Sequence, residues 1–484
     1  MDQRADPVRR RGYLVTADPV TAAALADAEG FMARLSAFIA QPSVGADPSY
    51  AAGMEGARTF LESRLAEIGF TGLRRLTASD GSGQPAIYAE WLGAGQAPTL
   101  LVYGHYDVQP PDPLDLWHSA PFEATPRDAR LYGRGVSDDK GPMMIAIEAM
   151  AAFLAVEGRL PVNVRLLLEG EEETGSPSLE PILVAHRDLL SADAVLSADG
   201  ARWRADLVSI NVGNRGICGF EITLRTAAKD LHSGRYGGVV PNALHEMAAL
   251  VSSLRDGAGR IMVEGFFDGV ADPTEAERAE IAAIPFGEYE VLDSIGSVAA
   301  GEPGYGFLER LWMRPTLDVN GLWGGYTGPG SKTVIPNMAH AKLTMRLVPV
   351  QDPQAVQDAV LHHLRRHCPP GAELSVTEDR GAAGAYAVPG DHPLLAAAEG
   401  ALETVTGARP VRVRIGATLP LTEIVKRKLG IDTVMFSFST ADEDYHAPNE
   451  FLRMSAIDEG LAAWVAILRR VGRQSRTDYV RCRA

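Results

Sequence analysis

Five short segments of the chain carry side chains of the types that bind metal ions or move protons. The first is His105, followed two residues later by Asp107, directly after the apolar run Leu100 to Tyr103. In the alternating register of a strand these two side chains point to the same side, so Asp107 can orient the imidazole of a metal-binding histidine. Taken alone, the same spacing is also typical of a structural histidine.

The second segment runs from Gly133 to Gly141 and places the adjacent acids Asp138 and Asp139 on a glycine-rich turn. We expect a helix to begin just after it, at Pro142. A carboxylate held on such a turn can use both of its oxygens, as the bridging of two metal ions requires. The alternative interpretation is an aspartate that caps the helix and has a solvated neighbour.

The third segment is the acidic run Glu169 to Glu173, which follows the apolar run Val162 to Leu168. Acidic runs usually form solvated faces. This run, however, terminates a predicted buried strand. Two adjacent glutamates on a turn can also take different roles: one can bind a metal while the other accepts a proton from metal-bound water.

The last two segments supply a further carboxylate and a second imidazole. Asp199 ends a short apolar run, and His446 follows the predicted strand Thr433 to Ser439. Histidine and carboxylate ligands without thiolates suit a pair of divalent ions such as zinc or manganese. We therefore predict a metal site built from five strand ends.

The elements that must position these side chains indicate an α/β domain. Short apolar runs that alternate with helical stretches predict a mostly parallel sheet, which gathers ligands at the carboxyl ends of its strands. The expected strands are 86–92, 99–104, 162–168, 194–198 and 433–439, and the expected helices are 19–40, 51–68, 143–156, 179–190, 392–405 and 455–471.

The pattern changes near Leu207, where longer alternating strands predict a smaller α+β unit. Its expected strands are 208–212, 219–225, 341–348 and 373–377, and its expected helices are 242–255 and 353–367. The unit also contains a long glycine-rich, acidic stretch at 257–315. We predict a domain at 211–384 inserted into a catalytic domain formed by 1–210 and 385–484.

The composition narrows the function classes. A chain of 484 residues predicts two or three domains, and a net charge of −16 argues against nucleic acid and anionic membranes as partners. Only Cys218, Cys368 and Cys482 are available for disulfides, which favours a reducing compartment. Arg9 to Arg11 precede an amphipathic stretch, and no segment has the roughly 18 apolar residues of a membrane span, so we expect a cytoplasmic protein.

The motifs GHYDVQP, GRGVSDDKG, EGEEETGS, SADG, NRGICGFEI and YHAPNE together resemble the dinuclear metallopeptidases that include aminoacylase, glutamate carboxypeptidase and the carnosine dipeptidases. The stretches DLHSGRYGG and SKTVIPNMAHAKLTMRLVP are most similar to the cytosolic nonspecific dipeptidase and carnosinase branch. The resemblance implies a catalytic α/β domain with an inserted dimerisation or lid domain, and a homodimer. It also implies two divalent ions per subunit, with zinc expected first and manganese or cobalt as alternatives.

Residue roles follow from the resemblance. It implies that His105, Asp138 and Asp199 bind one metal, and that Asp138, Glu173 and His446 bind the other, with Asp138 as the bridge. The peptide between Asp138 and Asp139 is expected to be cis.

The resemblance makes Glu172 the general base and Asp107 the partner of His105. Sliding the alignment of the triple glutamate by one residue would transfer the roles of base and ligand to Glu171 and Glu172.

The inserted domain is also expected to contribute to the site. His232, in the motif DLHSG, resembles a histidine that reaches the neighbouring subunit and donates to the developing oxyanion. Arg346 lies on an otherwise apolar strand and is positioned to bind a free substrate carboxylate, the alternative being an edge-strand arginine in water. Further candidates for substrate contact are Thr333, Asn337, Arg414 and Thr418.

These observations favour hydrolysis of peptide bonds in dipeptides or short peptides, by a bridging hydroxide with a glutamate general base. The alternative is an amidohydrolase that cleaves N-acyl or N-carbamoyl amino acids with the same dinuclear site. Asp199 and the dipeptidase-like inserted domain favour the peptidase, because many acyl-amino-acid relatives carry glutamate at that ligand position. A silent scaffold protein would be expected to lose a ligand or the base, and none is lost.

Overall fold

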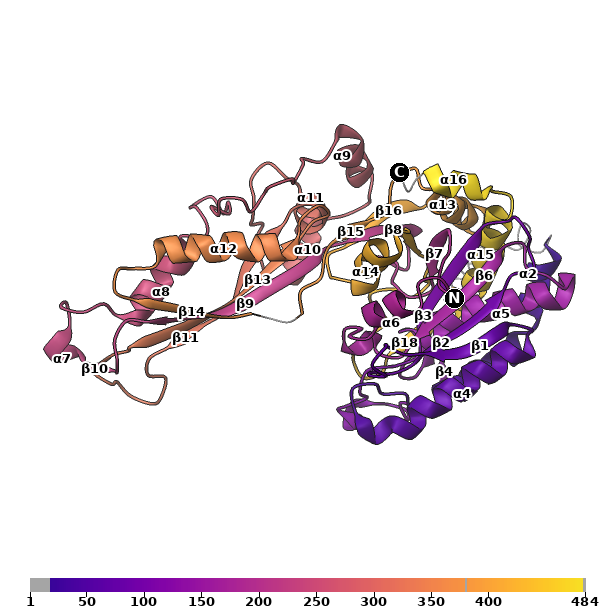
Figure 1. Ribbon diagram of the computed structural model, residues 1–484, viewed down its shortest axis with the longest axis horizontal. Helices are drawn as coiled ribbons and strands as arrows, with labels where there is room; N and C mark the ends of the chain where they lie inside the picture. Colours follow the sequence, from indigo (N-terminus) through magenta and orange to yellow (C-terminus); the bar gives the residue numbers. More distant parts are fainter. Residues whose placement is uncertain (1–17, 379–380, 482–484) are drawn as a thin grey trace, which may run out of the picture. The chain divides into compact units, whose positions relative to one another are not determined.

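The computed structural model describes residues 18–378 and 381–481, which form two compact units (Figure 1). The first unit comprises 18–212, 388–413 and 424–481, and the second comprises the described residues of 213–387 together with 414–423. The segment 414–423, which the sequence prediction assigns to the catalytic domain, therefore belongs with the second unit. Arg9 to Arg11 and Cys482 lie outside the described residues. Within the described ranges, no helix combines the length and apolar character needed to cross a membrane.

A six-stranded sheet forms the centre of the first unit. Its strands are, in spatial order, β1 (Thr71–Leu76), β2 (Ala86–Trp91), β6 (Asn163–Glu169), β3 (Thr99–His105), β7 (Ala194–Ser197) and β17 (Thr433–Met435). The four strands from β6 to β17 run parallel, whereas β2 is antiparallel to both of its neighbours, β1 and β6. Every residue of β3 is buried, as expected for a central strand covered on both faces. The predicted mostly parallel sheet is confirmed.

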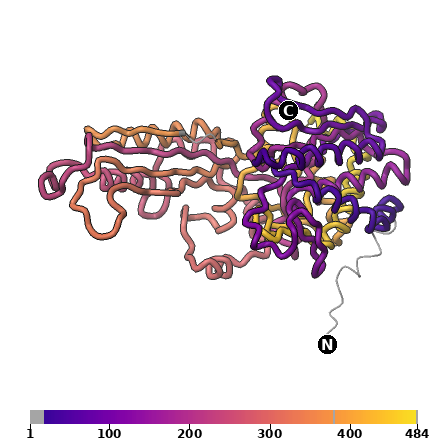
Figure 2. The backbone as a smooth tube through the Cα atoms, turned by 90° about the horizontal axis from the view of Figure 1, so that it is seen from below, coloured from indigo at the N-terminus to yellow at the C-terminus, as the bar shows by residue number. Residues whose placement is uncertain are grey.

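Helices from both ends of the described chain surround this sheet. They are α2 (Pro19–Ala26), α3 (Ala28–Ile39), α4 (Ala51–Glu67), α5 (Lys140–Glu157), α6 (Leu179–Ala185), α13 (Pro393–Thr406), α15 (Met454–Val471) and α16 (Arg476–Arg481), while α14 (Pro420–Leu429) crosses the boundary at 423. The late helix α15 packs against the early helices α2 and α5. Figure 2 shows the same interleaving of indigo and yellow segments, which is the expected result when one domain is inserted into another.

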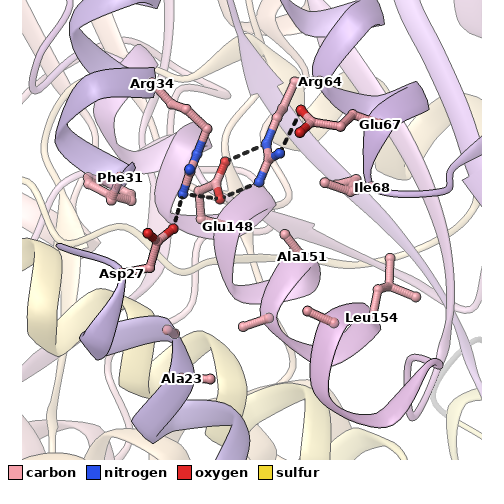
Figure 3. A pocket seen from close by; sticks show the side chains of 13 residues that line it. Ala23, Asp27, Phe31, Arg34, Arg64, Glu67, Ile68, Glu148, Ala151 and Leu154 are labelled. Atoms are coloured by element: carbon pink, nitrogen blue, oxygen red, sulfur yellow. Dashed lines mark hydrogen bonds and ion pairs between the residues drawn. The ribbon is translucent and has the colours of Figure 1, made fainter. Parts of the chain in front are cut away.

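A buried carboxylate ties three of these helices together. Glu148 of α5 is 6% exposed, and it accepts hydrogen bonds from Arg64 of α4 at 2.8 and 2.7 Å. Arg34 of α3 lies 2.9 Å from the same carboxylate (Figure 3). These side chains line a cavity of about 510 Å³. Because a buried charge is costly without its partners, losing either side of this network would cost about 3–5 kcal/mol.

The second unit is built on an antiparallel sheet of β11 (Thr316–Gly324), β13 (Met338–Leu347), β9 (Gly216–Arg225) and β14 (Glu373–Glu378), in that order. Alternate residues of β13 are buried, and α8 (Ala243–Ser252) and α12 (Pro353–His367) pack on the sheet. The remaining elements that begin in this unit are β10 (Leu231–His232), α7 (Ser233–Tyr236), α9 (Glu275–Ala282), α10 (Glu288–Ser294), α11 (Phe307–Met313), β12 (Val334–Ile335) and β15 (Tyr386–Ala387). The stretch 257–315, predicted only as glycine-rich and acidic, thus contains three helices.

Short elements complete the chain and correct several predicted boundaries. These are β4 (Thr125–Arg127), β5 (Arg130–Tyr132), β8 (Ser209–Asn214), β16 (Val411–Ile415), β18 (Phe451–Arg453), and the single 3-10 turns at Pro48–Tyr50, Leu114–Leu116 and Glu172–Thr174. The predicted helix 19–40 is interrupted at Asp27, which leaves helical geometry and pairs with Arg34. The predicted helix 179–190 stops at Ala185, and the predicted strand 433–439 stops at Met435.

Candidate dinuclear metal centre

His105 ends β3 and is fully buried. Its Nδ1 lies 3.0 Å from the backbone oxygen of Asp107 and 3.5 Å from the Asp107 carboxylate. With Nδ1 donating to that backbone oxygen, Nε2 is left to act as a metal ligand. The sequence predicts that the Asp107 side chain orients the ring, and the structure adds a main-chain contact that is shorter. Burial opposes a positive charge on His105, but hydrogen bonds with Asp107 and Asp138 outweigh burial and raise its pKa well above the ordinary value.

Asp138 faces a histidine with each of its two carboxylate oxygens. Oδ1 lies 3.1 Å from Nε2 of His105, and Oδ2 lies 3.0 Å from Nε2 of His446. Burial raises the pKa of Asp138, but the two histidines outweigh it and hold that pKa well below its ordinary value. The peptide that joins Asp138 to Asp139 is cis. This geometry is that of a carboxylate able to bridge two ions.

Asp138 is not on a strand of the main sheet. It precedes α5 and follows β5, which pairs with β4 and β18 in a separate three-stranded sheet. The sequence predicts ligands at five strand ends, and the strand that precedes Asp138 belongs to this smaller sheet. His105, Glu173 and Asp199 do follow β3, β6 and β7, and His446 lies on the chain after β17.

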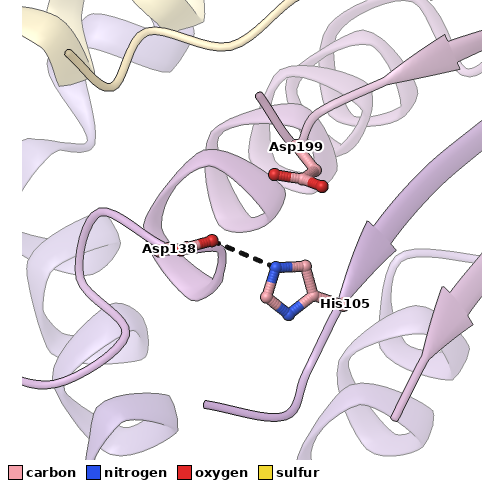
Figure 4. A group of neighbouring side chains, drawn as sticks. All are labelled: His105, Asp138 and Asp199. Carbon is pink, nitrogen blue, oxygen red and sulfur yellow. Dashed lines mark hydrogen bonds and ion pairs between the residues drawn. The ribbon is translucent and has the colours of Figure 1, made fainter. Parts of the chain in front are cut away.

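The structure brings the candidate ligands together in two groups that share Asp138. One group is His105, Asp138 and Asp199 (Figure 4), the other is Asp138, Glu173 and His446, and the ligand atoms of each group lie within 4.8 Å of one another. Imidazoles and carboxylates without thiolates form a donor set that fits two divalent ions. These residues thus fit the metals that the sequence predicts.

In the acidic run at the end of β6, Glu173 belongs to a group of candidate ligands, whereas Glu171 and Glu172 do not. Glu173 lies 3.0 Å from His446 and also accepts a hydrogen bond from Gln109 at 2.8 Å, a contact that sequence reasoning missed. Because Glu173 occupies the ligand group, the unshifted alignment, in which Glu172 is the base, is favoured over the shifted one. Asp107 accepts the backbone N–H groups of both Glu172 and Glu173, at 3.2 and 3.1 Å, and so fixes this turn.

Burial, together with the crowding of carboxylates, raises the pKa of acidic groups in the site. Burial raises the pKa of Asp199 to about 6, with a further contribution from Asp138, although His105 opposes the shift. Burial likewise raises the pKa of Glu172 well above its ordinary value, again against His105 and with the charges of Asp199 and Asp138. So many carboxylates are stable side by side only when protons or cations share the site with them.

The site has one closed side and one open side. His105 is fully buried, whereas the His446 side chain is 51% exposed. His105 is therefore enclosed within the first unit, whereas His446 keeps an exposed surface.

His232 and two other predicted contact residues lie near one another in the second unit. His232 is exposed in β10 and pairs with Val334 of β12, the residue that follows Thr333. Asn337 donates its backbone N–H to Asp230 at 3.1 Å, on the same chain segment as His232. The strand β10, which carries His232, lies at one end of the unit (Figure 1).

Two arginines form a second group in this unit. Arg346 donates a hydrogen bond to the Thr418 hydroxyl at 3.0 Å, and both Arg346 and Arg215 line a cavity of about 630 Å³. Arg215 is only 8% exposed, and its Nη1 has no hydrogen-bond partner. Burial and the nearby charge of Arg346 lower the pKa of Arg215 to about 10. Arg414, a predicted contact residue, instead pairs with Glu277 at 3.2 Å.

Sequence reasoning did not single out Arg215. Its position inside the motif NRGICGFEI, at the junction of β8 and β9, was the available signal. Two neighbouring guanidinium groups, one of them buried with an unused donor, are suited to bind an anionic group such as a carboxylate.

Histidines and carboxylates gathered around one shared aspartate, beside a mostly parallel α/β sheet, define the class of a dinuclear metallohydrolase. Residues 101–470 match the sequence profile of peptidase family M20/M25/M40, and the chain belongs to this family.

Individual relatives agree with this membership. A mouse (Mus musculus) Beta-Ala-His dipeptidase is 31% identical over 402 residues, which cover 81% of this chain and 80% of the relative. A Cys-Gly metallodipeptidase of Candida albicans is 30% identical, with coverage of 88% and 91%. The crystal structure of an M20 family metallo-carboxypeptidase from Sulfolobus solfataricus has a TM-score of 0.76 and 32% identity, and the match covers 91% of this chain and 99% of the other.

Proposed function

We propose that this protein is a dinuclear metallodipeptidase that hydrolyses peptide bonds in dipeptides or short peptides. The observation that carries the proposal is the sharing of Asp138 between two groups of metal-ligand side chains. The dipeptidase activity named for the mouse and Candida relatives supports the choice of substrate.

The proposed chemistry divides between the metals and the protein. Two divalent ions held by His105, Asp138, Glu173, Asp199 and His446 would supply an activated water and polarise the scissile carbonyl. Asp107 keeps the ring of His105 in the orientation that this requires, because it contacts Nδ1 and leaves Nε2 free to bind.

Glu172 is proposed to move the proton. Its carboxylate accepts a proton from the attacking water while the water oxygen bonds to the carbonyl carbon. It then returns that proton to the leaving amine nitrogen as the carbon–nitrogen bond breaks. Glu172 directly precedes the candidate ligand Glu173 on the same turn, and a general base must lie this close to the metals.

Recognition of the substrate is proposed to use Arg346 and Arg215. A dipeptide and the substrate of a carboxypeptidase share a free terminal carboxylate, which matches the bidentate donor geometry of a guanidinium. Thr418 holds one nitrogen of Arg346 and so limits the positions that this side chain can take.

We also propose a homodimer in which His232 acts across the interface. His232 lies in the second unit, whereas all the candidate metal ligands lie in the first. A donor to the oxyanion must come within hydrogen-bond distance of it, and a second chain would supply such a donor. The cytoplasmic location expected from the sequence stays a prediction.

The alternative activity is cleavage of N-acyl or N-carbamoyl amino acids at the same centre. The test is a comparison of kcat/KM for a panel of dipeptides with that for N-acetyl and N-carbamoyl derivatives of the same amino acids, using metal-loaded protein. We expect the dipeptides to be cleaved at least about 100-fold more efficiently, because the site would be matched to their transition state. A preference for the acylated compounds would replace the dipeptidase with the amidohydrolase.

A further inference from the structure

Glu450 is a buried carboxylate beside the candidate metal centre to which the sequence assigns no role. It is the last residue of the motif YHAPNE and is 0% exposed. Its Oε2 accepts hydrogen bonds from the Arg134 guanidinium at 2.7 Å and from the backbone N–H of Gly135 at 2.9 Å. Its Oε1 accepts the backbone N–H groups of Ser137 at 2.9 Å and Asp138 at 3.1 Å.

All four partners are N–H donors, so the carboxylate acts only as an acceptor. One of the four is the backbone of Asp138, the residue whose side chain faces both histidines. The carboxylate is therefore hydrogen-bonded along the whole turn that presents Asp138 to the site, without being in either group of candidate ligands.

Glu450 also connects this turn to the segment that carries His446. Its backbone oxygen accepts the N–H of Gly133 at 3.1 Å, and Arg134 donates to the backbone oxygen of Ala447 at 3.2 Å. The turn and the His446 segment are more than 300 residues apart in the sequence. Hydrogen bonds around Glu450 thus hold two distant ligand-bearing segments in one arrangement.

We propose that Glu450 is a positioning residue that fixes Asp138 relative to His446 and thereby sets the affinity of the centre for its metals. This inference rests on the proposed dinuclear function. Groups that orient metal ligands without touching the metal typically change metal affinity about 10- to 100-fold when replaced.

The substitution Glu450→Gln is a sharp test of the positioning role, because all four groups that contact the carboxylate are N–H donors. Each carboxylate oxygen accepts two N–H groups, so the amide NH₂ of glutamine would meet two donors whichever way the amide turns. The turn at Asp138 must then move away from its place beside His446. Glu450→Asp keeps the charge and both acceptors, and we expect it to recover part of the lost affinity.

The experiment measures Zn²⁺ affinity by competition with a chromophoric chelator for metal-free wild type, Glu450→Gln and Glu450→Asp. Glu148→Gln is the matched control, because Glu148 is another buried carboxylate held by arginines, and its partners Arg34 and Arg64 are not candidate ligands. We expect Glu450→Gln to bind at least one ion 10- to 100-fold more weakly. Glu148→Gln should lower the unfolding temperature while its Zn²⁺ affinity stays within about threefold of wild type.

The proposal is overturned if Glu450→Gln binds both ions as tightly as wild type, or if Glu148→Gln weakens binding equally. A wild type that binds fewer than two ions would instead contradict the proposed dinuclear function. Should Glu450→Gln fail to fold, hydrogen exchange of the metal-free wild type decides the question. We expect slow exchange at the amides of Gly135, Ser137 and Asp138, and rapid exchange there would overturn the positioning role.

Discussion

The carboxylate of Asp107 accepts the backbone N–H of Glu172 at 3.2 Å. The residue that contacts the ring of His105 therefore also anchors the turn that carries the proposed general base. A single buried residue links a metal ligand to the group that would move the proton, so the position of the base is coupled to that of the ligand.

Replacing the proposed base should separate metal binding from turnover. We expect Glu172→Gln to keep both metals and to lose about 10²- to 10⁴-fold in kcat, because an amide preserves the shape of the side chain but cannot accept a proton. Steady-state kinetics and elemental analysis of the same sample measure the two quantities.

Glu171→Gln is the control for this prediction. We expect it to stay active, because Glu171 is neither a candidate ligand nor the proposed base. If Glu171→Gln were inactive and Glu172→Gln active, the assignment of base and ligand would shift by one residue.

The two arginines of the second unit should select substrates with a free carboxylate. We expect Arg346→Met and Arg215→Met each to lower kcat/KM for free dipeptides at least about tenfold, because a hydrogen bond to a charged group contributes about 1.5–3 kcal/mol. Dipeptides with an amidated terminus should be much less affected. Arg414→Met, whose guanidinium already pairs with Glu277, serves as the control. Equal losses for free and amidated substrates would contradict carboxylate recognition.

An ion pair on the first unit predicts part of the acid sensitivity of the fold. Hydrogen bonds from Arg75, opposed by partial burial, lower the pKa of Glu55 from 4.5 to about 2. The unfolded chain therefore binds a proton at Glu55 before the folded chain does. The stability that the pair contributes is present above pH 4.5 and is lost as the pH falls toward 2.

Arg75→Met should reduce this dependence. We expect the variant to lose less unfolding free energy than wild type as the pH falls through this window, and at neutral pH to be less stable by no more than about 1 kcal/mol, since the pair is largely exposed. Denaturant unfolding at several pH values measures both effects. Identical pH slopes for the two proteins would show that the pair does not act in this way.

Mixed dimers test the proposed role of His232. Chains with His232→Ala and chains with Glu172→Gln should each be nearly inactive alone. Co-refolded heterodimers should regain about half the wild-type activity, because one of their two sites would contain both intact residues. If mixed dimers form but recover nothing, or if the active species is a monomer, His232 does not act across an interface.

The sheet and the family could be predicted from the sequence because their signals are local. The strand Thr99–His105 is apolar throughout its buried length and ends in the histidine, so element and candidate ligand appear in one short stretch. The break in the predicted helix 19–40 at Asp27 is harder to predict from the sequence. The apolar periodicity continues through this position, although the backbone of Asp27 leaves helical geometry.

Other features depend on contacts between residues far apart in the chain. In the sequence, Glu450 is only the last residue of a motif. The folded chain shows that its carboxylate accepts a hydrogen bond from the backbone N–H of Asp138. Arg215 likewise has no local partner that would reveal it, since its significance lies in burial beside Arg346. Long-range pairing of this kind leaves no periodicity in a single sequence.

The proposed dinuclear function depends most on the sharing of Asp138 by two metal ions. The direct test is the number of divalent ions bound per chain, measured by elemental analysis of gel-filtered wild type and Asp138→Ala, with circular dichroism to verify folding. We predict two ions for wild type and at most one for Asp138→Ala, with loss of dipeptide hydrolysis, because the other candidate ligands cannot offset the repulsion between two dications. A single ion in the wild type, or two ions retained by folded Asp138→Ala, would contradict the shared centre.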